Sequence, residues 1–144
     1  MARVKIELPE NFVFETNIAV RIDDVNYGNH LGNDAIVGYL QEIRLRFLAK
    51  YNLSELDIGG ASLIQADLAV SYKSEGFYGN QVKGEINVAD FSKAGFDFVY
   101  RLNNETTGKL MAVAKTGMVC FNYEERKIRE VPTTFISLIE KLNK

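Results

Sequence analysis

The stretch 24-DVNYGNHLGND-34 runs directly into 35-AIVGYLQEIRLRFLAKY-51, and together the two segments decide how the rest of the chain is arranged. The second segment repeats apolar residues at intervals of three and four, which predicts a helix of about four to five turns. The apolar positions take up most of its circumference: Ile36, Val37, Tyr39, Leu40, Ile43, Phe47, Leu48 and Tyr51. The sequence therefore predicts a long central helix that other elements cover on most sides.

The segments around this helix alternate apolar and polar residues at a period of two, which is typical of half-buried strands. One precedes the helix at 12–22, and four follow it, at 61–72, 82–91, 96–102 and 110–121. Short turns join the later segments, so we expect antiparallel neighbours, and Pro132 then opens a short amphipathic helix. This order predicts an α+β fold in which an antiparallel sheet of about five strands wraps around the central helix.

Length and composition exclude several classes of protein. The 144 residues fit a single domain spanning 1–144, and a net charge of -2 offers no positive field that would attract nucleic acid. Cys120 is the only cysteine and cannot form an internal disulfide, so we interpret it as core filling in a cytoplasmic protein. No signal peptide and no run of eighteen apolar residues is present, which predicts no membrane association.

The loop before the helix concentrates polar and flexible residues around the only histidine, His30. One interpretation is structural: a capped turn, with Asn33 or Asp34 accepting a hydrogen bond from the first amides of the helix. The other is chemical, because Asp24 and Asp34 flank His30, and free amides at a helix start stabilise a developing oxyanion. Together these groups would supply a general base, amide donors and an anion hole.

The segment RIDDVNYGNHLGND at 21–34, followed by YLQEIR at 39–44, resembles the signature of the hotdog-fold acyl-CoA thioesterases, in the 4-hydroxybenzoyl-CoA thioesterase-like group. That signature reads approximately D-x-D-x-x-G-H-V-N-N and precedes a helix bearing E-x-x-R. The resemblance covers nearly the whole chain. It implies a hotdog fold, hydrolysis of acyl-CoA thioesters to free acid and CoA without a cofactor, and an active site formed across a dimer interface.

Residue by residue, the resemblance aligns Asp24 with the first aspartate of the signature, His30 with its histidine and Asn33 with its second asparagine. At the second aspartate, the catalytic carboxylate of many members, this chain has Asn26. An amide cannot act as a general base or as a nucleophile, so another carboxylate must act or the chemistry has been lost. In the signature a glycine directly precedes the histidine, whereas in this chain Asn29 separates Gly28 from His30.

Three carboxylates are candidates to replace the missing acid. Asp34 is favoured because it lies at the helix start beside Asn33, although a helix cap explains it equally well. Asp67 lies within the apolar strand sequence IQADLAV, where it either faces solvent or reaches the loop of a partner subunit. Glu42, on the helix with Arg44, has the helical setting that a second branch of the family uses for catalysis, but a structural ion pair is the simpler role.

The leading hypothesis from sequence is an acyl-CoA thioesterase in which Asp34 or Asp67 activates water and the helix amides polarise the carbonyl. The alternatives are a non-catalytic acyl-CoA-binding domain, suggested by Asn26, and an enoyl-CoA hydratase or dehydratase, because one fold hosts several activities. Exposed sheet edges favour a homodimer or homotetramer. One histidine and one cysteine cannot supply zinc ligands, so no metal site is expected.

Overall fold

The computed structural model describes residues 2–144, and in it the sheet and the long helix form as predicted. A five-stranded antiparallel sheet has the order β1-β3-β4-β5-β2, and a short strand, β6, pairs with β5. The strands are β1 (Phe14–Ala19), β2 (Ser62–Tyr72), β3 (Gln81–Ala89), β4 (Gly95–Asn104), β5 (Lys109–Asn122) and β6 (Lys127–Ile128). The predicted α+β fold is therefore confirmed.

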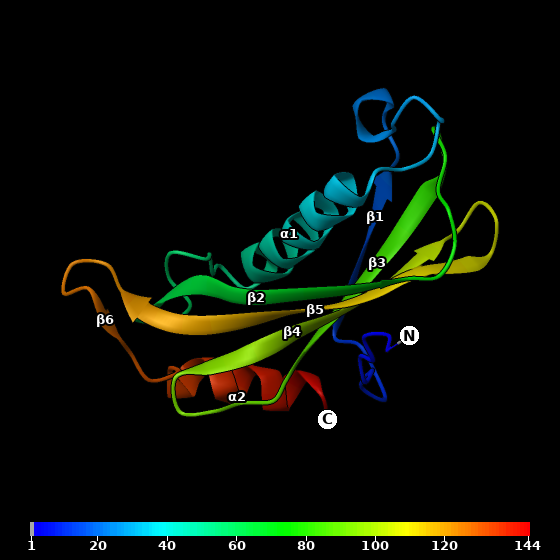
Figure 1. The fold of residues 1–144 in the computed structure, drawn as a ribbon. Helices are drawn as coiled ribbons and strands as arrows, with labels where there is room; N and C mark the ends of the chain where they lie inside the picture. Colours follow the sequence, from blue (N-terminus) through cyan, green and yellow to red (C-terminus); the bar gives the residue numbers. More distant parts are fainter. Residues whose placement is uncertain (1) are drawn as a thin grey trace.

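The central helix α1 (Asn33–Lys50) lies across one face of the curved sheet (Figure 1). The other helical elements are a short 3-10 helix, η1 (Ile22–Asp24), and α2 (Thr133–Leu142), which lies below β4 in this view, away from the loop that precedes α1. Sequence patterns did not predict η1 or β6, because three and two residues are too short to establish a period.

The core lies between α1 and the sheet. Leu40, Ile43 and Phe47 are fully buried on the sheet side of the helix, and the Phe47 ring meets Phe98 of β4 edge to face, with 6.5 Å between centroids. Gly84 of β3 allows this close approach, because a Cβ atom there would overlap the side chain of Ile43. Close packing of α1 on the sheet fixes the position of the loop that precedes the helix.

The opposite side of α1 is exposed, which the sequence did not predict. Val37 and Leu45 keep 37% and 39% of their surface accessible, and Gly38 is exposed between them. The prediction that other elements cover the helix on most sides is therefore wrong for a single chain. Val37 and Leu45 are therefore apolar residues on the surface of this chain.

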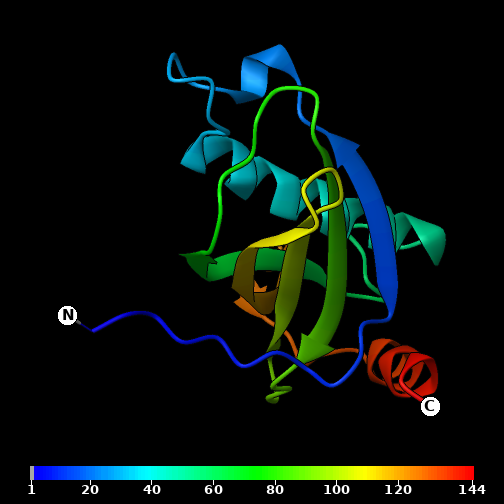
Figure 2. The same cartoon turned by 90° about the vertical axis from the view of Figure 1, so that its right-hand side faces the viewer.

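The N-terminal segment runs across the sheet before the chain turns into β1 (Figure 2). Val4 to Glu7 face Ala69, Val99 and Lys115 across a cavity of about 400 Å³. Further along, the ring of Phe12 stacks on the guanidinium of Arg101, 4.6 Å away. This segment therefore covers part of the sheet face that points away from α1.

Candidate active site

The segment from Asp24 to Gly32 forms a small closed loop in front of α1. The amide of Asn26 donates to the carbonyl of His30, and the amide of Gly32 donates to the carbonyl of Asp24, each over 2.9 Å. Asn29 turns the chain with a φ of 63°, a left-handed conformation that asparagine adopts more readily than most residues. The loop thus returns on itself and brings His30 close to the start of α1.

The side chain of Asn26 holds this loop in shape. Its Oδ1 accepts hydrogen bonds from the amide of Gly28 at 3.0 Å and from the amide of His30 at 3.2 Å. A carboxylate oxygen would accept the same two bonds, so the loop itself does not require an acid or an amide. Asn26 therefore has a structural role here, and its amide is not basic enough to activate water.

The connection between β2 and β3 holds His30 in place. The Nδ1 atom lies 3.2 Å from Oε1 of Glu75, and the ring packs against Phe77 with 5.2 Å between centroids. The backbones are also joined, because the Leu31 amide donates to the carbonyl of Gly76 over 2.7 Å. Since Glu75 contacts Nδ1, Nε2 is the ring nitrogen available to a ligand. The side chain is 41% exposed, so His30 is both fixed and accessible.

The first turn of α1 has no side-chain cap. The helix begins at Asn33 after Gly32, and no side chain accepts a hydrogen bond at the cap position. The prediction that Asn33 or Asp34 caps the helix is therefore wrong, because both residues already lie inside the first turn and the capping position falls on a glycine. The amides of this turn carry the positive end of the helix dipole.

Asp34 bends back over Gly32. Its Oδ1 lies 2.5 Å from the position that a Cβ atom on Gly32 would take, so only glycine leaves room for the carboxylate there. Both Asn33 and Asp34 are exposed. This end of α1 thus combines a carboxylate that can take a proton with amides that stabilise a developing negative charge.

Asp24 serves to join η1 to α1. Its Oδ2 accepts hydrogen bonds from the Tyr39 hydroxyl at 2.7 Å and from the Arg21 amide at 3.0 Å. Burial alone would raise the pKa of Asp24, but these bonds outweigh it and hold the pKa below its ordinary value of 3.8. Asp24 is therefore an anchored, ionised carboxylate, with both partners on its own chain.

We expect Asp24→Asn to lower the stability of the fold by about 1 to 2 kcal/mol at pH 7, because a charge-assisted bond becomes a neutral one. Since the folded-state pKa of Asp24 is lowered, its stabilisation is present above about pH 4 and is lost as the pH falls through the folded-state value. Urea unfolding at pH 7 and at pH 3 measures this. Asp23→Asn, at an exposed neighbour, is the control; an Asp24→Asn deficit as large at pH 3 as at pH 7 would contradict the prediction.

Asp67 lies on the sheet face that points away from α1. Thr116 of β5 faces the core, where its Oγ1 lies 2.7 Å from the hydroxyl of buried Tyr100, so its neighbours Lys115 and Gly117 face the other way. Asp67 is the register partner of Gly117, and its Oδ1 lies 2.9 Å from the Gly117 amide and 2.9 Å from Nζ of Lys115. The hydrogen bond from Lys115 lowers the pKa of Asp67. Within one chain, Asp67 is an ion-paired surface carboxylate.

Two charged residues of α1, Glu42 and Arg44, form ion pairs with different partners. Glu42 forms an exposed pair with Arg46 at 2.8 Å, whereas Arg44 is buried and pairs with Glu55. The structural ion pair predicted for Glu42 is therefore present, and its partner is Arg46, four residues further along the helix. Arg44 also donates to the hydroxyl of Tyr100 at 3.4 Å, so it ties α1 to β4 from inside the core.

Cys120 and the acidic residues form no metal site. Cys120 is fully buried, and burial raises the pKa of its thiol to about 11, in agreement with core filling. Across residues 2–144, no three His, Cys, Asp or Glu side chains are grouped closely enough to hold a metal ion. In the same residues, no helix is both long enough and apolar enough to cross a bilayer.

The model of the thioesterase-like superfamily matches residues 20–139, which include the His30 loop, α1 and strands β2 to β6. The chain belongs to the thioesterase-like superfamily. A search of curated protein sequences gives no match for it.

Solved structures are similar to this thioesterase-like chain over nearly its whole length. A 1,4-dihydroxy-2-naphthoyl-CoA thioesterase from Synechocystis is 19% identical, with a TM-score of 0.80, and the match covers 91% of this chain and 98% of that one. A DHNA-CoA thioesterase from Staphylococcus aureus is 23% identical, with a TM-score of 0.78, covering 90% and 91%. A thioesterase from Thermus thermophilus, complexed with coenzyme A and Zn, is 17% identical, with a TM-score of 0.80, covering 93% and 96%. At these identities the likeness establishes the hotdog fold.

In this thioesterase-like chain, the structure brings some predicted site residues together and separates others. His30, Asn33 and Asp34 lie at the junction of the loop and α1, while Asn26 and Asp24 support that junction through hydrogen bonds. Asp67 and Glu42 lie elsewhere on the chain, each in an ion pair. Sequence reasoning missed Glu75 and Phe77, which fix His30; the turn FYGN just after Glu75 is the signal that could have drawn attention to them.

Proposed function

We propose that this thioesterase-like chain hydrolyses acyl-CoA thioesters to a free acid and CoA at the N-terminus of α1. The observation that carries the proposal is the uncapped start of α1, which carries Asp34 in its first turn and follows the His30 loop. Asp34 takes a proton from water, whose oxygen attacks the thioester carbonyl carbon. The carbonyl oxygen becomes negative and accepts hydrogen bonds from the first amides of α1. The C–S bond then breaks, and the departing thiolate takes up the proton.

His30 and Asn33 position the substrate in this proposal. Glu75 contacts Nδ1 of His30, so Nε2 is directed to the carbonyl or to the attacking water. The exposed amide of Asn33 offers a second polar contact at the helix start. A thiolate leaving group needs little protonation, so a carboxylate with these donors suffices and no cofactor takes part.

The names of similar proteins support this substrate class. Two of the solved structures with the same fold are named as CoA thioesterases, and two others were determined in complex with CoA. We carry acyl-CoA over to this chain as a proposal, because the identities, 17% to 23% for the structures compared above, support the fold alone.

A second copy of the chain is part of the proposal. The outer edge of β2 is unpaired within residues 2–144, and Ile64, Leu68 and Tyr72 of this strand keep 36%, 38% and 46% of their surface exposed. A long apolar edge strand favours pairing with another chain. We propose that two copies join their β2 strands, which would extend the sheet around both α1 helices and enclose the site.

The direct test is to incubate the purified chain with acyl-CoAs of several chain lengths and with an aromatic acyl-CoA, and to follow the release of free thiol. We expect at least one thioester to be hydrolysed at a rate proportional to the protein concentration. If no thiol is released from any of them at micromolar protein, the proposal fails.

The position of Asp34 gives a prediction at Gly32. Gly32→Ala would place a methyl group where the Asp34 carboxylate now lies, and the backbone there, with φ of -72°, accepts alanine. We expect kcat to fall by about 10-fold or more through misplacement of Asp34, with the melting temperature within about 2 °C of the wild type. Gly38→Ala, where a Cβ atom meets nothing within 4 Å, is the matched control. Equal kcat values for the two variants would contradict this role of Asp34.

The competing function is a domain that binds acyl-CoA without turnover, which Asn26 at the usual acid position favours. Asn26→Asp tests it, because a carboxylate keeps both bonds to the loop amides. If the wild type hydrolyses acyl-CoA, we expect Asn26→Asp to change the rate by less than about 10-fold, since Asp34 already supplies the base. An inactive wild type that binds acyl-CoA, together with an active Asn26→Asp, would establish the binding domain instead.

A further inference from the structure

An apolar stripe crosses one end of the sheet, on the face that points away from α1. Register partners in an antiparallel sheet point to the same face. Ile64 of β2 is the partner of Val119 in β5, and Phe121 of β5 is the partner of Ile128 in β6. Val119 and Phe121 lie two and four positions beyond Gly117, which faces away from α1, so all four side chains do the same. We call these four residues the outer stripe.

Solvent reaches the outer stripe. Ile64 and Ile128 keep 36% and 64% of their surface exposed, and Val119 and Phe121 are partly buried. Tyr123, whose ring meets Phe121 edge to face, is exposed as well and extends the stripe. Single exposed apolar residues are common, but a contiguous group of them marks an interaction surface. Pairing of β2 edges through the backbone leaves this surface open, because the side chains of a strand point to the faces of the sheet.

A cavity of about 340 Å³ joins the outer stripe to a group of carboxylates. Its lining includes two residues of the stripe and three acids: Val119, Ile128, Asp67, Asp90 and Asp97. Among residues 2–144, the ion pairs of these acids involve a single cation, Lys115, at 2.9 Å from Asp67 and 3.4 Å from Asp97. Burial raises the pKa of Asp97, and the charges of the other two acids add to the rise although Lys115 opposes it. The cavity therefore keeps a net negative charge beside an apolar surface.

The N-terminal segment of the chain shows which kind of sequence this surface accepts. The segment 3-RVKIE-7 alternates charged and aliphatic residues, and its first two charges are basic. Lys5 and Ile6 line the cavity of about 400 Å³ between this segment and the sheet. Asp90 and Asp97 line both cavities, so the two hollows meet at the same carboxylates. One hollow is bordered by a basic and aliphatic segment of the chain itself, and the other lies open along the outer stripe.

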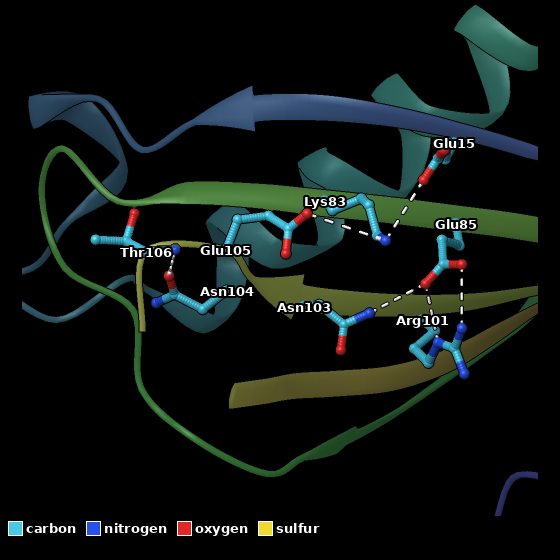
Figure 3. A network of polar contacts seen from close by, with 8 residues as sticks. All are labelled: Glu15, Lys83, Glu85, Arg101, Asn103, Asn104, Glu105 and Thr106. Atoms are coloured by element: carbon cyan, nitrogen blue, oxygen red, sulfur yellow. Dashed lines mark hydrogen bonds and ion pairs between the residues drawn. The ribbon is translucent and has the colours of Figure 1, made fainter. Parts of the chain in front are cut away.

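Another part of the same sheet face is less suited to a contact. It carries the polar network of Figure 3, in which Arg101 binds Glu85 through two hydrogen bonds of 2.9 and 3.1 Å. Asn103 adds a third bond to Glu85, and Lys83 contacts Glu15 at 3.5 Å. A network already satisfied within the chain loses water without new bonds when it is covered. A partner therefore gains most at the outer stripe and its cavity.

We propose that the outer stripe and its cavity bind an extended segment of a partner protein that alternates basic and aliphatic side chains. The aliphatic side chains pack on Ile64, Val119 and Ile128, and a lysine or arginine enters the cavity beside Asp90 and Asp97. Charge complementarity selects a basic segment over an acidic one. The proposal does not depend on the chemistry at the start of α1, because that helix lies on the other face of the sheet.

The first test uses three fluorescently labelled peptides and the full chain. The probe alternates lysine with isoleucine, and its two controls alternate glutamate with isoleucine and lysine with serine. We expect fluorescence anisotropy to give a Kd of about 10 to 100 µM for the probe and at least about 10-fold weaker binding for each control. Salt at about 0.5 M should weaken binding of the probe. No saturable binding of the probe below about 1 mM, or equal binding of either control, overturns the proposal.

Variants of the chain locate the contact. Ile128→Ser should weaken binding of the probe by about 10-fold, because an aliphatic contact is lost. Asp97→Asn should weaken it by about 5-fold and reduce its dependence on salt. Ile22→Ser is the matched control, since Ile22 is 66% exposed, close to the 64% of Ile128, but lies in η1. Equal losses of affinity in the two isoleucine variants overturn the proposal.

A second copy of the chain is the competing occupant of this surface. Ile128→Glu places a charge in the outer stripe, where it would disrupt an apolar contact between copies. We expect this variant to sediment with the same particle mass as the wild type. A lower mass would show that a second copy covers the stripe, and would overturn the proposal.

Discussion

Asp34→Asn is expected to lower kcat for acyl-CoA hydrolysis by about 10²- to 10⁴-fold, the range that a positioned general base contributes. The amide has nearly the shape of the carboxylate but cannot take a proton from water. Because Asp34 is exposed and makes no cap bond, the fold does not depend on its charge. KM should therefore stay within about 3-fold of the wild type. Steady-state release of free thiol, with the melting temperature measured in parallel, checks both parts.

Asp67→Asn is the matched control, because it removes the other carboxylate that the sequence suggested as the base. Asp67 is held by Lys115 on the sheet face away from α1, so we expect kcat to stay within about 3-fold of the wild type. A large loss of kcat in Asp67→Asn with little loss in Asp34→Asn would reverse the assignment. In that case the Asp67 of a partner subunit would be the group that reaches the substrate.

Arg44→Met is expected to lower the free energy of unfolding by about 3 kcal/mol, more than any other substitution proposed for this chain. Arg44 is 6% exposed and contacts both Glu55 and the hydroxyl of Tyr100. Its removal leaves Glu55 partly buried without its counter-ion, and breaking a buried pair in this way typically costs about 3 to 5 kcal/mol. We take the lower end of this range because the Glu55 side chain is 24% exposed. The midpoint of urea unfolding measures the loss.

Arg46→Met, on the same helix, separates this effect from the general loss of an arginine. The Arg46 side chain is 41% exposed, pairs with the exposed Glu42 and donates to Oγ1 of Thr16 and to the carbonyl of Asn17 at the surface, so we expect a loss of about 1 kcal/mol. Equal losses in the two variants would show that the buried contacts of Arg44 do not hold α1 to the sheet.

Much of the fold follows from residue periods alone. The period of two in β1 and β3 predicts Ile18, Val82 and Ile86 as buried, and all three are; in β3, however, Glu85 and Asn87 on the other face are buried as well. The repeat in α1 likewise predicts Leu40 and Phe47 as core residues. These predictions succeed because one buried face fixes the register of each element.

The sequence was less informative where the outcome depends on contacts between distant segments. Glu75 meets His30 only because the β2–β3 connection packs against the loop before α1. Similarly, Arg44 is buried in α1 although a charge favours solvent, because its partner Glu55 comes from the loop that follows the helix. The face of α1 with Val37 was predicted to be buried because apolar residues take up most of the helix circumference, and a period cannot show which of them face solvent.

Hydrolysis of a thioester at the start of α1 is tested most directly by a crystal structure of the chain with a non-hydrolysable CoA thioester analogue. We predict that the carbonyl oxygen lies within hydrogen-bonding distance of the first amides of α1, with the Asp34 carboxylate on the side from which water attacks and Nε2 of His30 nearby. An analogue whose carbonyl lies away from this helix start, for example beside Asp67 and Lys115, would show that the chemistry has been placed at the wrong site.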